Sequence, residues 1–256
     1  MPHAYPTTEH RSAAEAIVEY FENRGYVDAV LLTNSCARGK ATPDSCLDIS
    51  VLVQAHTAIP EIERVWEAFY HAEPVFDKLR GVGRFAEVHL DVISGQYKPA
   101  ERNWTGGPDM FEIEIGNHLA YSVPLCERTD RYQQLRSEFL PYYDDALRSV
   151  RLAMLRMYCK NDLDHIPVYI PRGLYFQSFN RLYDAYRGFL QCLFIERRTY
   201  PIAYDKWIKE QIVEILDLPD LYAELPHLFE IAHFESDDIL TKSIRLRELL
   251  DTYAAG

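Results

Sequence analysis

One short stretch of the chain, residues 29–53, places polar side chains where nucleotide chemistry could occur. It reads as a buried apolar strand, Ala29 to Leu32, followed by a turn that carries Ser35. A second strand, Cys46 to Val53, carries Asp48 in its first half. This arrangement can hold a nucleoside triphosphate and its metal ion: the serine-bearing turn can bind phosphate oxygens, and the inward carboxylate of the second strand can bind the metal.

The order of these residues resembles the signature of the nucleotidyltransferase superfamily, which has the polymerase-β-like fold. That signature is an apolar strand ending in Gly-Ser, an Ala-Arg-Gly-like segment, and Ser-Asp-x-Asp on the next strand. Six positions agree with it: Ser35, Ala37, Arg38, Gly39, Ser45 and Asp48. Two differ, because Asn34 replaces the glycine and Cys46 replaces the first aspartate.

The resemblance implies transfer of a nucleoside monophosphate from a nucleoside triphosphate, ATP above all, to a hydroxyl of an unknown small-molecule or protein acceptor. It implies Mg²⁺ as the cofactor, with Asp48 and Asp91 as catalytic metal ligands. Ser35 and the amides that follow it would hold phosphate oxygens. Arg38 and Lys40 would add phosphate contacts, although solvated surface charge is an equally simple interpretation.

The two departures differ in consequence. Asparagine can adopt the left-handed conformation that glycine supplies, so Asn34 is compatible with the turn. Cys46 offers a soft thiol, which is a poor ligand for magnesium, or simply a small buried apolar group. Asp44 or Glu87 could replace the lost carboxylate, or the site could use one metal ion.

Two further alternatives stay open at this point. Cys46, His89 and Asp91 could together bind zinc. The chain could also be a catalytically degenerate relative that binds a nucleotide or a partner without turnover.

A second distinctive string runs from Ile195 to Trp207. It is similar to a Tyr-x-Pro…Lys-Trp segment in the C-terminal helices of some nucleotidyltransferase-like families. That similarity implies that Lys206, with Arg197 or Arg198, faces the nucleotide. The alternative is a packed helix corner with Lys206 in solvent.

The pattern of strands and helices that must position these residues predicts an α+β fold. It consists of a mixed-sheet domain over residues 1–128 and a helical bundle over 129–256. A third strand, Arg84 to Ile93, alternates so that Glu87, His89 and Asp91 share one face. Helical periodicity predicts helices over 12–24, from Pro60 to about His71, and over 135–159, 175–198, 205–216, 221–234 and 239–253, with a break over 161–171.

Composition limits the partners. The 256 residues carry a formal charge of −12, which argues against binding of long nucleic acid. Five scattered cysteines without CxxC spacing favour a reducing compartment. No signal peptide and no membrane-spanning apolar run is recognisable, so we expect a cytoplasmic protein with no membrane contact.

Overall fold

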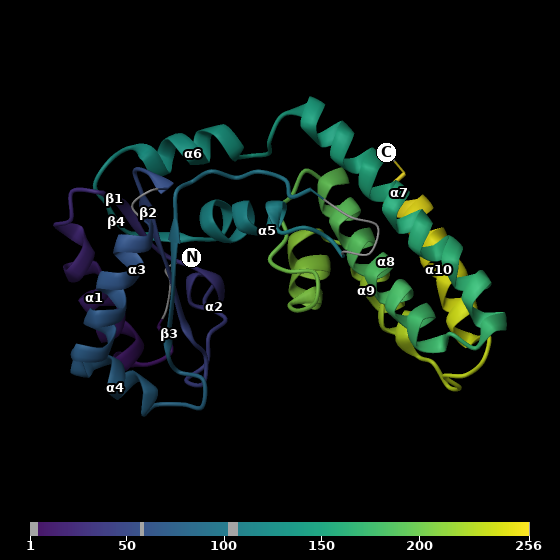
Figure 1. Cartoon of the computed structure of the whole chain (residues 1–256), viewed down its shortest axis with the longest axis horizontal. Coiled ribbons are helices and arrows are strands. Elements are labelled where there is room, and N and C mark those ends of the chain that lie inside the picture. Colours follow the sequence, from purple (N-terminus) through teal and green to yellow (C-terminus); the bar gives the residue numbers. More distant parts are fainter. Residues whose placement is uncertain (1–4, 57–58, 102–106, 256) are drawn as a thin grey trace. The chain divides into compact units, whose positions relative to one another are not determined.

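A computed structural model describes residues 5–56, 59–101 and 107–255 of the chain. These residues form two compact units (Figure 1). Unit 1 comprises Met1–Lys98 and Glu114–Leu140, and unit 2 comprises Pro99–Ile113 and Pro141–Gly256. The sequence placed one boundary near residue 128. In the structure the chain enters unit 2 at Pro99, returns to unit 1 at Glu114, and leaves it again after Leu140.

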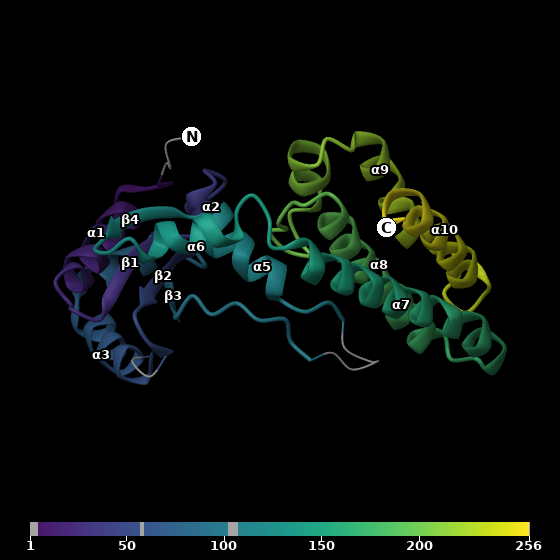
Figure 2. The same cartoon turned by 90° about the horizontal axis from the view of Figure 1, so that it is seen from above.

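Unit 1 is built on a four-stranded mixed sheet of order β3-β2-β1-β4, which can be followed in Figure 2. The strands are β1 (Val27–Leu32), β2 (Leu47–Val53), β3 (Val88–Ile93) and β4 (Val123–Glu127). β1 pairs antiparallel with β2 and β4, whereas β2 pairs in parallel with β3. Parallel neighbours need a crossover connection, and here two helices supply it. This mixed sheet, together with the helices of both units, confirms the predicted α+β class.

One face of the sheet packs against three helices: α1 (Thr8–Glu22), α3 (Ile59–Ala72) and α4 (Pro74–Arg80). Alternate β2 side chains, Leu47, Ile49 and Val51, point into this core. Since side chains alternate along a strand, Asp48 and Ser50 point to the opposite face. The alternation thus separates an apolar face that binds helices from a face that carries polar groups.

Shorter elements complete unit 1. α2 (Asn34–Ala37) follows β1 directly. α5 (Phe111–Ile115) begins in unit 2 and ends in unit 1, where it leads into the π-helical turn η2 (Gly116–Ala120). α6 (Arg131–Phe139) follows β4. Gly95, with φ 69°, follows β3 where a Cβ atom would lie only 2.5 Å from Leu135 Cδ1, so α6 approaches the end of β3 closely.

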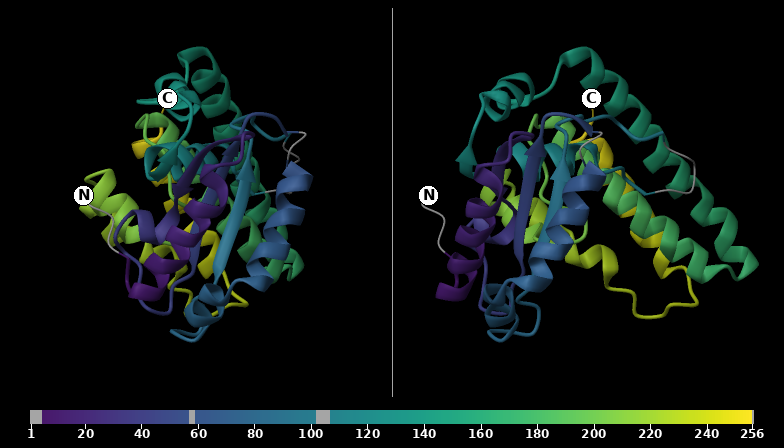
Figure 3. Two further views of the ribbon diagram at one scale, coloured as in Figure 1. Left: turned by 90° about the vertical axis from the view of Figure 1, so that its left-hand side faces the viewer. Right: turned by 60° about the vertical axis from the view of Figure 1, so that its left-hand side comes forward.

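Unit 2 is helical, and α7, α8 and α10 pack side by side (Figure 3). Its elements are α7 (Asp145–Tyr169), η3 (Ile170–Arg172), α8 (Tyr175–Glu196), η4 (Glu210–Ile215), α9 (Pro219–Glu224), η5 (Pro226–Phe229) and α10 (Asp238–Tyr253).

Three helix predictions need correction in these helices. The predicted helix over 135–159 is two helices, α6 and α7, separated around Pro141. The predicted break over 161–171 is wrong, because α7 continues to Tyr169 with Pro167 inside it. The predicted helix over 221–234 is a short α9 followed by the 3-10 turn η5.

A buried ionic cluster, which we call the Arg151 cluster, joins Asp109 and Glu112 to α7 and α8 of unit 2. Arg151 is 1% exposed and donates to both carboxylates of Asp109 and Glu112. Gln191 donates to the same two carboxylates. Burial of charge is tolerated only when hydrogen bonds replace water, and here they do.

Within the described part of the chain, no helix combines the length and apolar character needed to cross a bilayer.

Candidate functional site

The structure brings Cys46, Asp48 and His89 together on the polar face of the sheet, and we call this group the Asp48 cluster. The parallel register of β2 and β3 sets Asp48 directly opposite His89. Opposed residues in a sheet point to the same face, so both side chains meet there. Cys46 precedes β2 and lies two residues before Asp48, which places it on that face as well.

Asp48 lies at the centre of the cluster. It is 8% exposed, and its carboxylate oxygens lie 3.4 and 3.5 Å from the Cys46 Sγ. His89 Nδ1 lies 3.4 Å from Asp48 Oδ1. The ring's other nitrogen, Nε2, lies 3.3 Å from Glu87 Oε1. The imidazole therefore stands between two carboxyl groups, one at the centre of the cluster and one outside it.

Asp91, the second predicted catalytic carboxylate, continues the same face. It pairs with Ser50 in the β2–β3 register and is two residues beyond His89. Burial first, and then the negative charge of Asp48, raise the pKa of Asp91, while His89 opposes the rise. The structure thus brings the predicted pair Asp48 and Asp91 within electrostatic reach of each other.

The serine-bearing turn lies beside Asp48. The Thr33 N–H donates to the Asp48 carbonyl oxygen at 3.0 Å, so the turn leaves β1 next to this residue. Asn34 has φ 52°, in the left-handed region that asparagine can adopt in place of glycine. Ser35 is buried at 8% exposure, and its carbonyl accepts the Lys40 N–H at 2.9 Å. The turn is therefore a closed, ordered loop.

The predicted basic residues fall in both units. Arg38 is half-buried and Lys40 is exposed, and both follow the turn in unit 1. Lys206 is exposed and belongs to unit 2. Its contact with a nucleotide stays a prediction.

The segment around Lys206 is a packed corner on its other side. Tyr200 is 2% exposed, and its hydroxyl accepts the Tyr143 N–H at 3.1 Å. The buried Gln211 side chain accepts the Ile202 N–H and donates to the carbonyls of Ala203 and Lys206. These contacts agree with the interpretation of this string as a helix corner with a solvated lysine.

Two residues that could have replaced the missing carboxylate have other roles. Asp44 is exposed, and its Oδ1 accepts the Arg84 N–H at 2.9 Å, which fixes the 41–45 loop. Glu87 reaches His89 and not Asp48 directly.

The donors of the Asp48 cluster do not fit a pair of magnesium ions. Magnesium takes oxygen ligands in near-octahedral geometry, and a pair needs several carboxylates. The cluster offers a thiol, an imidazole and one carboxylate. The zinc alternative considered from the sequence named Cys46, His89 and Asp91, whereas the structure joins Asp48 to Cys46 and His89. The parallel register that makes this difference is not visible in the sequence.

A further cysteine packs next to this site. Cys36 is fully buried and its Sγ donates to the Cys46 carbonyl at 3.7 Å. Burial first, and then the charges of Asp48 and Cys46, raise the pKa of the Cys36 thiol to about 12. Cys36 therefore stays a neutral thiol beneath the cluster.

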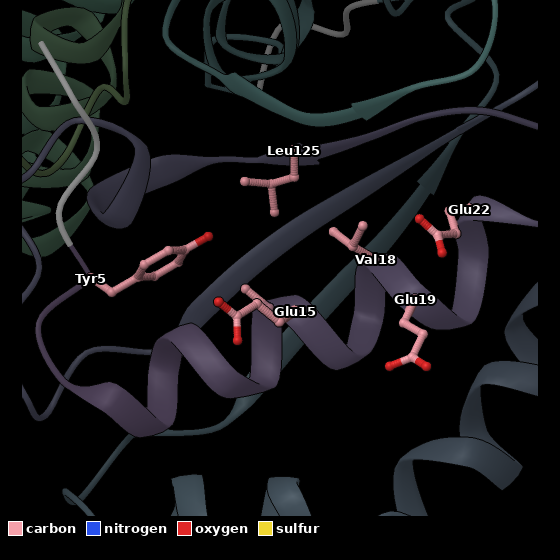
Figure 4. Close-up of a pocket in the computed structure, with 7 residues that line it drawn as sticks. Tyr5, Glu15, Val18, Glu19, Glu22 and Leu125 are labelled. Atoms are coloured by element: carbon pink, nitrogen blue, oxygen red, sulfur yellow. The ribbon is translucent and has the colours of Figure 1, made fainter.

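A hollow of about 420 Å³ lies elsewhere in unit 1, along α1 (Figure 4). Its lining is Tyr5, Ala14, Glu15, Val18, Glu19, Glu22 and Leu125. Three glutamates would repel a triphosphate, and no predicted site residue lines it. This hollow is not the predicted nucleotide site.

Comparison with known proteins finds similarity among solved structures and none at the level of sequence. No protein-family model matches the chain, and no curated protein sequence matches it. Among solved structures, the chain is similar to the crystal structure of a nucleotidyltransferase-like protein from Exiguobacterium sibiricum 255-15, with 14% identity and a TM-score of 0.48. The match covers 96% of this chain and 75% of that chain. A similarity of this size assigns no role to any residue, so the roles below rest on the geometry of this chain.

Proposed function

We propose that unit 1 binds a nucleoside triphosphate, ATP in the first instance, with a divalent cation at Asp48. We further propose that it transfers the nucleoside monophosphate to a hydroxyl of a small-molecule or protein acceptor. The acceptor oxygen would bond to the α-phosphorus, the bond to pyrophosphate would break, and the hydroxyl proton would leave to solvent.

One observation carries this proposal: the Thr33–Asp48 hydrogen bond of 3.0 Å joins the serine-bearing turn to the strand that holds the carboxylate. Phosphate oxygens and a metal ion bind side by side in nucleotide sites, so a phosphate-holding turn and a metal ligand must be neighbours. Asp48 and its neighbour Asp91 share the face next to this turn.

Each residue has a distinct proposed part. Ser35 and the amides of its turn would orient the phosphates, and Arg38 with Lys40 would offset their charge. Asp48 and Asp91 would hold the cation. Transfer of this kind depends mainly on positioning and on stabilisation of developing charge, because the protein forms no covalent bond.

Release of pyrophosphate from labelled ATP tests transfer directly. The full chain is incubated with Mg²⁺, Mn²⁺ or Zn²⁺ in parallel, with water or added hydroxyl compounds as acceptors. We expect release that requires a divalent cation and falls at least 100-fold in Asp48→Asn. Asp44→Asn is the matched control, because it removes an acid of the adjoining loop that bonds Arg84 instead of the cluster. Equal release by the two variants would contradict the proposal.

A second candidate function is nucleotide binding without turnover, and Cys46 favours it. Its thiol occupies the position expected for a carboxylate, 3.4 Å from Asp48 Oδ2, so the site lacks one negative charge. In this case ATP binds and no pyrophosphate is released under any of the three cations. Cys46→Asp would then add the missing charge and strengthen Mg²⁺ binding.

A further inference from the structure

The Asp48 cluster has the donor set of a site for a softer cation than magnesium. Thiolate, imidazole and carboxylate are the three ligand types that zinc takes in proteins. Cys46, Asp48 and His89 supply one of each, and their ligand atoms all lie within 4.8 Å of one another. Three ligands from the protein leave a fourth tetrahedral position open.

The distances agree with a shared metal ion. Zinc–sulfur bonds of about 2.3 Å and zinc–nitrogen or zinc–oxygen bonds of about 2.0 Å place tetrahedral S and O ligands about 3.5 Å apart, and N and O ligands about 3.3 Å apart. Asp48 Oδ1 lies 3.5 Å from Cys46 Sγ and 3.4 Å from His89 Nδ1. The two ligand–ligand distances that start at Asp48 Oδ1 therefore already have the lengths that a shared tetrahedral zinc ion requires.

The ring of His89 has the outer contact that metal-bound histidines need. A metal-bound histidine commonly donates a hydrogen bond from its second ring N–H to a carboxylate. This bond fixes the orientation of the ring and makes the first nitrogen a better ligand. His89 presents Nδ1 to Asp48 and Nε2 to Glu87 Oε1, at 3.3 Å. Its side chain is 55% exposed, so the ring can turn to close the remaining edge toward Cys46, and a cation can enter from solvent.

We propose that Cys46, Asp48 and His89 bind one Zn²⁺, with Glu87 orienting the histidine and the fourth position open to water or to an oxygen of a bound ligand. Binding releases the Cys46 thiol proton, since the thiolate is the ligand. The inference rests on the proposed function for the cation at Asp48. It names that cation as Zn²⁺ and gives it Cys46 and His89 as ligands beside Asp48, in place of Asp91. It does not require nucleotide transfer.

Cobalt is the probe, because a cobalt–thiolate bond adds a near-ultraviolet charge-transfer band and a tetrahedral site gives intense visible bands. The full chain is stripped with a chelator, titrated with Co²⁺ without nucleotide, and then titrated with Zn²⁺. We expect one equivalent of Co²⁺ to produce both features, Zn²⁺ to displace it, and millimolar Mg²⁺ to leave it bound.

Variants separate the cluster from adventitious thiol binding. Cys46→Ser removes the charge-transfer band and lowers Zn²⁺ affinity at least tenfold, while Glu87→Gln keeps the band and lowers affinity about tenfold. Cys126→Ser is the matched control, because this partly exposed thiol lies on β4 and its loss leaves both readouts unchanged. Far-ultraviolet circular dichroism confirms that each variant is folded.

The result that overturns the proposal is the absence of a thiolate band in the folded chain, or equal Zn²⁺ affinity in the native chain and Cys46→Ser. Displacement of Co²⁺ by Mg²⁺ would overturn it as well. The metal titration contains no nucleotide, so its outcome is separate from that of the pyrophosphate assay. Zn²⁺ binding in the titration, with no pyrophosphate release in the assay, would refute the proposed transfer alone. Pyrophosphate release with Mg²⁺, with no thiolate band in the titration, would refute the zinc site alone.

Discussion

Replacement of Arg151 by methionine is expected to destabilise unit 2 strongly. The guanidinium makes four hydrogen bonds: Nε and Nη2 to Glu112 at 2.6 and 2.7 Å, and Nη2 and Nη1 to Asp109 at 2.7 and 3.1 Å. Tyr143 and Gln191 also donate to this pair of carboxylates. Methionine fills much of the volume but removes the positive charge that these two carboxylates share.

The magnitude follows from burial. The side chains of Arg151, Asp109 and Glu112 are 2%, 6% and 0% exposed, so the variant leaves two negative charges together, away from water. Breaking a buried pair in this way costs about 3–5 kcal/mol. Neutralising both acids in the same chain, as Asp109→Asn with Glu112→Gln, should recover more than half of the loss.

Hydrogen exchange followed by mass spectrometry is the suitable assay, because a chain with two compact units need not unfold in one step. We expect faster exchange in α7 and α8, with β1 and β2 unchanged. Arg245→Met is the control: its side chain is 47% exposed and pairs with Glu224, itself 44% exposed, so its loss should cost less than about 1 kcal/mol. Equal effects of the two substitutions would refute the reasoning from burial.

Two other predictions concern unit 1. Burial lowers the pKa of His118 from 6.5 to about 4, so the folded state favours the neutral ring. The stability that the neutral ring contributes is fully present above pH 6.5. As the pH falls toward 4, the free energy of unfolding should fall by up to about 3 kcal/mol for this reason. Urea unfolding at pH 7 and pH 4.5 should show a smaller pH-dependent loss in His118→Gln, and an identical loss would contradict the assignment. Asn34, at φ 52°, should tolerate glycine, whereas Asn34→Ala should lower the free energy of unfolding by about 1 kcal/mol. Thermal melts of the two variants measure the difference, and equal melting temperatures would show that the left-handed turn does not limit stability.

The sheet of unit 1 was predictable because period-two alternation is a local property. β1, β2 and β3 lie where the sequence placed them, although the predicted third strand, Arg84 to Ile93, begins four residues before β3 does. His89 and Asp91 share a face as predicted, and Glu87, which precedes β3, reaches His89. The parallel register that sets Asp48 against His89 was not predictable, since it depends on how the crossover helices return the chain to the sheet.

The helical unit was harder to predict because distant contacts decide its helices. Pro167 and its neighbours suggested a break, yet α7 continues because Leu163 and Ile166 are buried and Asp162 pairs with Arg181 on α8. Val150 has helical spacing to the apolar residues Leu147 and Met154 in the sequence, yet it is 66% exposed.

The Arg151 cluster was missed for the same reason. Its partners lie 39 to 42 residues away along the chain. One feature of the sequence points to this cluster. Arg151 lies four residues after Leu147 and four before Leu155, so it is a charged residue on the helix face that these two apolar residues share.

The most direct test of the central claim, that the Asp48 face joins a metal ion to a nucleotide, is the affinity of the full chain for ATP with and without a divalent cation. Calorimetric titration in Zn²⁺, in Mg²⁺ and in chelator gives the three constants. The account predicts at least tenfold tighter ATP binding with cation than in chelator, and loss of that gain in Asp48→Asn but not in Asp44→Asn. Equal affinity in all three conditions, or a gain that persists in Asp48→Asn, would contradict it.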